Sequence, residues 1–125
     1  MDQEPVKLGR INRAVEKALK EDFGEEVWIY LLAEDLDKMA SKWPTIYLSR
    51  ISEASKIIKT PDYAAYLEKE NTLYFIKEYL KDGHFQKVAL SVKKEGQWHL
   101  KELFTLKDDE SVRLAQEGIL ARVNA

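Results

Sequence analysis

The amino-acid sequence predicts an α+β domain, in which N-terminal helices and a C-terminal helix pack on a four-stranded antiparallel sheet. Three observations predict this class: apolar residues recur at helical spacing in the first half, four strand-length runs follow, and an amphipathic segment closes the chain. Helices that are segregated from consecutive antiparallel strands are typical of α+β folds. We expect residues 1–9 to form an N-terminal arm and residues 10–125 to form one domain.

The first half of the domain is predicted to contain three helices and one strand. Residues 10–24 place apolar side chains three and four positions apart, which is typical of an amphipathic helix that ends near Gly24. Residues 27–32 are aromatic and β-branched and predict a strand. A short helix is expected over residues 33–40 and a longer one over residues 45–60.

The second half is predicted to be an antiparallel meander with strands at 63–67, 73–80, 85–92 and 97–106. Gly96 suits the left-handed position of a three-residue loop in the last hairpin. That hairpin would place Val92 opposite Trp98 and Ser91 opposite His99, so that one sheet face is apolar and the other is polar and basic. Acidic and capping residues at 107–111 precede an apolar helical stripe and predict the closing helix.

Composition disfavours several classes of protein. The 125 residues carry 20 basic and 22 acidic side chains, and the net charge of −2 disfavours strong nonspecific binding to nucleic acid. The absence of cysteine excludes a disulfide framework, a thiolate metal site and a cysteine nucleophile. No apolar stretch approaches the roughly 20 residues of a membrane span, so we expect a cytoplasmic protein. Glycine-rich phosphate loops and zinc-spaced histidines are missing, which disfavours nucleotide-driven and metal-driven enzymes.

His99 is the first candidate for chemistry, because an imidazole can transfer protons near neutral pH. The predicted register puts it on the polar sheet face beside Ser91, with Lys101 and Lys87 nearby. The alternative interpretation is an ordinary solvated sheet face, on which Lys, His and Ser have no catalytic role.

Glu102 is the second candidate, because strand alternation points it to the same side as Leu100 and Phe104. A carboxylate on an apolar face costs free energy unless it is paired or hydrogen-bonded. Three interpretations of Glu102 stay open. It acts as a general acid or base, it forms a salt bridge to Arg50 or Lys56 of the neighbouring helix, or the strand register differs from the predicted one.

Five segments of the chain carry a family resemblance: Trp28-Ile29-Tyr30-Leu31-Leu32, Asp37–Pro44, Ile57-Ile58-Lys59-Thr60-Pro61-Asp62-Tyr63, Phe85-Gln86-Lys87-Val88-Ala89-Leu90-Ser91-Val92 and Gly96-Gln97-Trp98-His99-Leu100. Over residues 27–106 the sequence resembles the phage-associated barnase/EndoU/colicin/RelE-like nuclease group. The resemblance implies a barnase/RelE-like fold and a small metal-independent endoribonuclease of phage or mobile-element origin, toxin-like, without a cofactor and with a protein inhibitor as a partner. Such an enzyme activates the ribose 2′-hydroxyl, protonates the leaving 5′-oxygen and stabilises the phosphorane with cations.

The histidine motif of that group is altered here, because Lys38 and Trp43 stand at the two histidine positions and Glu102 stands where a Ser or Thr is expected. The resemblance therefore implies a replacement set, with the catalytic residues His99, Lys101, Lys87 and Glu102 and the RNA-binding residues Lys38, Lys56, Ser91 and Lys93. The alternative is a catalytically inactive protein of this fold that binds RNA or a protein. A homodimer through a free strand edge at residues 63–67 is a further expectation.

Overall fold

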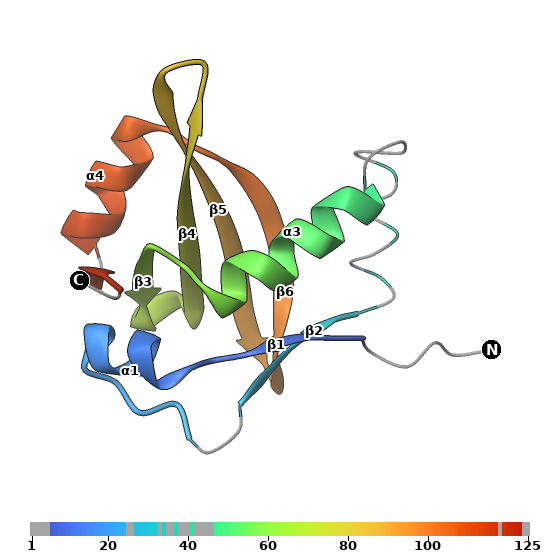
Figure 1. Ribbon diagram of the computed structural model, residues 1–125. Coiled ribbons are helices and arrows are strands. Elements are labelled where there is room, and N and C mark those ends of the chain that lie inside the picture. The colour runs from blue at the N-terminus through green and yellow to red at the C-terminus, as the bar shows by residue number, and fades with distance from the viewer. Residues whose placement is uncertain are drawn as a thin grey trace.

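The computed structural model describes residues 6–24, 27–32, 34, 37, 41, 47–117 and 119–123, which form a mixed sheet of seven strands with helices packed on it (Figure 1). In chain order the elements are β1 (Val6–Arg10), α1 (Arg13–Leu19), β2 (Trp28–Leu31), α3 (Tyr47–Lys59), β3 (Tyr63–Leu67), the 3₁₀ turn η1 (Glu68–Glu70), β4 (Thr72–Lys81), β5 (His84–Glu95), β6 (Gln97–Leu106), α4 (Asp108–Glu117) and β7 (Ile119–Arg122). The strand order across the sheet is β1-β2-β6-β5-β4-β3-β7. Within these described segments, no helix has the length and hydropathy needed to cross a bilayer.

The predicted four-stranded antiparallel sheet, and with it the barnase/RelE-like architecture of N-terminal helices on such a sheet, is wrong. Three further strands extend the sheet, and β2 pairs in parallel with β6. Residues 6–9 were expected in an arm, but β1 pairs with β2 because Leu8 is buried in the core. A register shift between Lys7 and Gly9 interrupts the strand alternation, so the sequence pattern does not reveal this strand.

The C-terminal strand β7 was also missed, because Ala115 and Ile119 are four residues apart and fit a continued helix. In the structure the chain leaves α4 and pairs with β3 as an antiparallel strand. Strand β3 therefore lies between β4 and β7. The edge that was predicted to be free at residues 63–67 is therefore occupied by β7.

The central meander was predicted well. Strands β3 and β6 have the predicted bounds, and β4 and β5 extend the predicted runs at their ends. Helices α3 and α4 occupy the expected positions, although the predicted start of α3 at residue 45 lies outside the described residues. Most of the short helix predicted over residues 33–40 also lies outside them.

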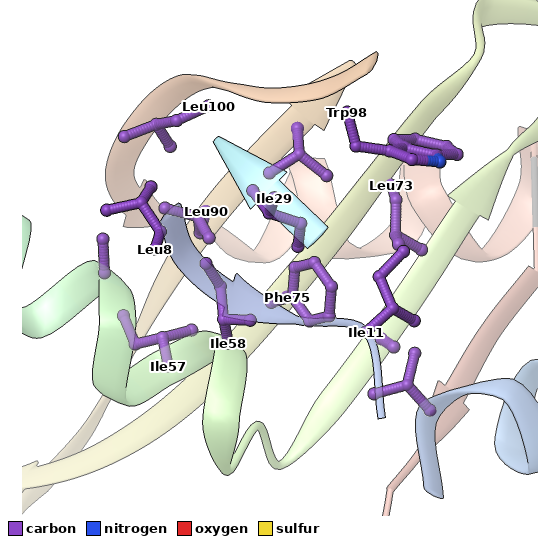
Figure 2. Packing of buried hydrophobic residues seen from close by; sticks show 14 of the residues in the cluster. Leu8, Ile11, Ile29, Ile57, Ile58, Leu73, Phe75, Leu90, Trp98 and Leu100 are labelled. Carbon is purple, nitrogen blue, oxygen red and sulfur yellow. The ribbon is translucent and has the colours of Figure 1, made fainter. Parts of the chain in front are cut away.

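The main core lies between the sheet and helices α1 and α3 (Figure 2). Phe75 is fully buried at its centre, and Ile57 and Ile58 of α3 pack over the same sheet face. Strand alternation turns the neighbouring residues to the other face, where Ile76 and Ala89 form a second buried cluster with Leu114 of α4. The second face is therefore partly apolar beneath α4, and the prediction of a wholly polar and basic face is wrong.

The β5–β6 hairpin differs from its predicted register. Gly96 has a φ of +79°, as expected, but the strands continue to Glu95 and Gln97 on either side of it. Val92 consequently faces Leu100 instead of Trp98. A β-bulge follows, because Ser91 pairs with Glu102, which leaves Lys101 as the extra residue of β6.

Gly9 allows α3 to approach β1 closely. A Cβ atom at this position would lie 2.9 Å from Cγ2 of Ile58. We expect Gly9→Ala to lower the free energy of unfolding by about 1–3 kcal/mol, measured by urea denaturation, because the packed helix has to shift. The same substitution should cost less in an Ile58→Ala background, which lacks the clashing methyl group. An equal loss of unfolding free energy in the two backgrounds would show that the contact between Gly9 and Ile58 does not determine how closely α3 packs on β1.

Candidate functional site: a basic cluster around Glu95

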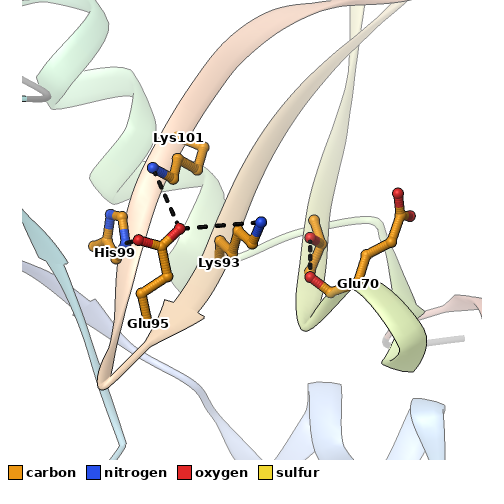
Figure 3. Close-up of polar contacts among 6 residues, drawn as sticks. Glu70, Lys93, Glu95, His99 and Lys101 are labelled. Carbon is orange, nitrogen blue, oxygen red and sulfur yellow. Dashed lines mark hydrogen bonds and ion pairs between the residues drawn. The ribbon is translucent and has the colours of Figure 1, made fainter.

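Four polar side chains meet near the turn of the β5–β6 hairpin, and we call them the Glu95 cluster: Lys93, Glu95, His99 and Lys101 (Figure 3). The Glu95 carboxylate lies 3.6 Å from Nζ of Lys101, 3.7 Å from Nε2 of His99 and 4.0 Å from Nζ of Lys93. All three neighbours are nitrogen atoms, so this one carboxylate is the centre of the cluster.

The strand geometry explains why these residues meet. Lys93 and Glu95 are two residues apart on β5 and therefore point to the same side of the strand. His99 pairs directly with Lys93 across the hairpin, and Lys101 is two residues further along β6, at the bulge. His99 also pairs with Tyr30 of β2 on its other side.

Exposure divides the cluster into an accessible part and a buried part. The side chains of Lys93, Glu95 and Lys101 are 43%, 53% and 33% exposed, whereas His99 is only 2% exposed. A ligand in solution can therefore reach the two ammonium groups and the carboxylate. The imidazole lies beneath them and can act by holding Glu95 in place.

The accessible groups carry an excess of positive charge, since two ammonium groups surround one carboxylate. Exposed ion pairs of this kind contribute little to stability, because water and salt screen them. Two lysines that converge on one point are suited to a phosphate group, which each can contact as a compact positive charge. Glu95 would compete with such a phosphate for both lysines.

Two of the predicted catalytic residues lie apart from this cluster. Lys87 is six residues from Lys93 on β5, a separation of about 20 Å along a strand. Its ammonium group lies 6.0 Å from the centre of the Tyr63 ring, and its register partners are Glu78 and Leu106. The predicted combination of Lys87 with His99 is therefore not formed.

Glu102 is exposed, which overturns its expected place on the apolar face. The bulge at Lys101 shifts the alternation of β6, so Leu103 takes the buried position after Leu100. Of the three readings that the sequence left open, a different register is the correct one.

The predicted RNA-binding residues likewise do not all lie at the Glu95 cluster. Lys93 belongs to the Glu95 cluster, and Ser91 lies two residues further along β5, 6% exposed. Lys56 is exposed on α3, beside strand β1 and away from the hairpin. Lys38 and Trp43 lie outside the described residues.

Tyr74 lies on β4 directly beside Ser91, which in turn pairs with Glu102, so that these three polar side chains form the next row of the sheet. Burial raises the pKa of the Tyr74 phenol above its ordinary value, and nearby Arg113 opposes this effect. The phenol therefore stays protonated at neutral pH, whereas the Ser91 hydroxyl beside it is buried.

Sequence reasoning missed Glu95, which had been assigned to the connecting turn. The available signal was the odd numbering of Lys93, Glu95, His99 and Lys101, which would share a face if both strands continued to Gly96.

Among the residues whose structure is described, no group of three His, Asp or Glu side chains is arranged to hold a metal ion. No family model, curated protein or solved structure matches this chain significantly.

Proposed function

We propose that this protein binds single-stranded RNA and that the Glu95 cluster contacts a phosphate of the strand. The observation that carries the proposal is the convergence of the half-exposed Lys93 and Lys101 on one point at the sheet surface. Lysines supply affinity for nucleic acid by neutralising phosphates and releasing counterions. The choice of RNA as the polymer rests on the resemblance to the nuclease group.

The row beside the cluster adds one accessible hydroxyl group. Ser91 follows Lys93 on the same sheet face but is buried, whereas the side chain of Tyr74 beside it is partly exposed. A hydroxyl group at this position can hydrogen-bond a phosphate, a base or a 2′-hydroxyl group of an unpaired strand. The overall charge of −2 requires such a contact to be local.

A second candidate function is metal-independent cleavage of the bound RNA, which the 3.7 Å approach of Glu95 to His99 favours. In this reaction Glu95 would remove the proton of a ribose 2′-hydroxyl, and the 2′-oxygen would attack phosphorus. The bond to the 5′-oxygen would break, leaving a 2′,3′-cyclic phosphate, while Lys101 would protonate the leaving oxygen. The burial of His99 and the distant position of Lys87 make binding without cleavage the better supported function.

The proposal is tested by titrating a fluorescently labelled single-stranded RNA of mixed sequence and following its anisotropy. We expect Lys93→Gln/Lys101→Gln to weaken binding by about tenfold or more, because both charged phosphate contacts are lost. The control is Lys69→Gln/Lys107→Gln, which removes the same charge at two exposed positions that do not belong to the Glu95 cluster. Equal affinity of the two double variants would contradict the proposed site.

The same samples distinguish binding from cleavage. We expect the RNA to remain intact after incubation with the wild-type protein in EDTA. A 2′,3′-cyclic phosphate product that is lost in Glu95→Gln would instead establish the second candidate function.

A further inference from the structure

A second basic site lies on another part of the molecule, in a groove of about 770 Å³ between β1 and α3. Its walls come from three elements: Leu8, Gly9 and Arg10 of β1, Trp28 of β2, and Ser55, Lys56 and Lys59 of α3. Asn12, just before α1, closes one end. A volume of several hundred Å³ is typical of sites for small organic ligands.

The frame of this groove is held by packing and by hydrogen bonds. Ile58 fits against Gly9 so closely that a side chain at that position would collide with it. The Ser55 hydroxyl donates to the carbonyl oxygen of Leu8, and the Asn12 amide donates to that of Lys59 at 3.2 Å. Asn12 also accepts from the Val15 amide as the cap of α1. The polar uncharged side chains of the walls therefore have partners within the protein, which leaves the cations to contact a ligand.

Among the described residues that line this groove, every charged side chain is a cation. Arg10, Lys56 and Lys59 contribute to its walls, and Lys7 stands close by with its ammonium group 4.9 Å from the centre of the Trp28 ring. In the described part of the chain no carboxylate pairs with Lys56 or Lys59. Two ammonium groups held on neighbouring turns of one helix without a carboxylate partner attract an anion.

A neighbouring groove differs in the charges that line it. It is lined by Arg10 and α1, and in it Glu16, Glu21 and Asp22 stand among the basic residues Arg13, Lys17 and Lys20. With Arg10 it has four basic and three acidic side chains, so most of its charges compensate one another. The groove between β1 and α3 therefore has the larger surplus of positive charge among the residues that are described.

We propose that the groove between β1 and α3 binds a nucleotide, with its phosphate on Lys56 and Lys59 and its base against Trp28. Lysine ammonium groups bind phosphate as point charges, and a partly exposed indole offers a surface on which a planar base can lie. Free nucleotides and single nucleotide units of an RNA strand share this chemistry. The site does not depend on the Glu95 cluster, so the two proposals can fail separately.

The test is equilibrium binding of a fluorescently labelled adenosine monophosphate and, in a parallel arm, of the labelled RNA used above. We expect Lys56→Gln/Lys59→Gln to weaken nucleotide binding about tenfold or more, because both charged contacts to the phosphate are lost. Lys69→Gln/Lys107→Gln again serves as the control of equal charge, and Trp28→Leu tests the base contact. Circular dichroism spectra establish that each variant is folded.

The outcomes separate the two sources of the nucleotide. Weakened binding of both the monophosphate and the RNA in Lys56→Gln/Lys59→Gln would support a site that accepts either source. Weakening of the monophosphate alone would identify free nucleotides as the ligand, and weakening of the RNA alone would identify a unit of the strand. If the wild-type protein binds neither probe, or if the double variant binds as tightly as its control, the proposal is overturned.

Discussion

Phe75→Ala is expected to lower the free energy of unfolding by about 3–5 kcal/mol, because it removes a large side chain from a core that cannot fully collapse around the space. Phe75 is fully buried on the interior strand β4, beneath α3, with Ala64 and Leu90 beside it on the neighbouring strands. A loss of this size is a large fraction of the stability of a small domain. Chemical denaturation followed by tryptophan fluorescence measures it.

Phe85→Ala is the matched control for this prediction. Phe85 is 73% exposed at the tip of the β4–β5 hairpin, so the same truncation there should change stability by no more than about 0.5 kcal/mol. Similar losses at Phe75 and Phe85 would contradict the placement of the core between the sheet and α3.

Glu95→Gln is expected to tighten the binding of single-stranded RNA about fivefold at low salt, because it removes the negative charge that competes with phosphate for Lys93 and Lys101. Glutamine keeps the shape of the side chain, so the change isolates the effect of charge. Anisotropy titration of the labelled RNA measures the affinity.

Glu68→Gln is the control for Glu95→Gln, since Glu68 is exposed in η1 and the substitution changes the net charge equally. We expect it to alter the affinity much less. Weaker binding in Glu95→Gln than in Glu68→Gln would mean that the carboxylate contacts the RNA directly, which is contrary to the proposed arrangement.

The meander could be predicted from the sequence because its strands carry local signals. Alternating apolar residues and turns at residues 68–71, 81–83 and 94–96 bound β3 to β6, and these signals need no distant partner. Strands β1 and β7 lack such signals. Each is short and is stabilised by pairing with a strand that is distant in the sequence, so helical spacing or a polar segment conceals it.

The candidate site was only partly predictable for a related reason. His99, Lys101 and Lys93 were correctly placed on one sheet face, since alternation alone determines this. The bulge at Lys101 and the extension of the strands to Glu95 arise from how the two strands pair, and the burial of His99 arises from its position between β2 and β5. The alternation of residues along a single strand does not indicate any of these features, and Glu95 was therefore missed.

The central claim is that Lys93 and Lys101 together neutralise a phosphate of a bound RNA, and the salt dependence of binding tests it most directly. Each phosphate neutralised on a single strand adds about 0.7 to the slope of log affinity against log salt concentration. We therefore expect the slope for Lys93→Gln/Lys101→Gln to be about 0.7 smaller than that for Lys69→Gln/Lys107→Gln. Identical slopes for the two double variants would contradict the account.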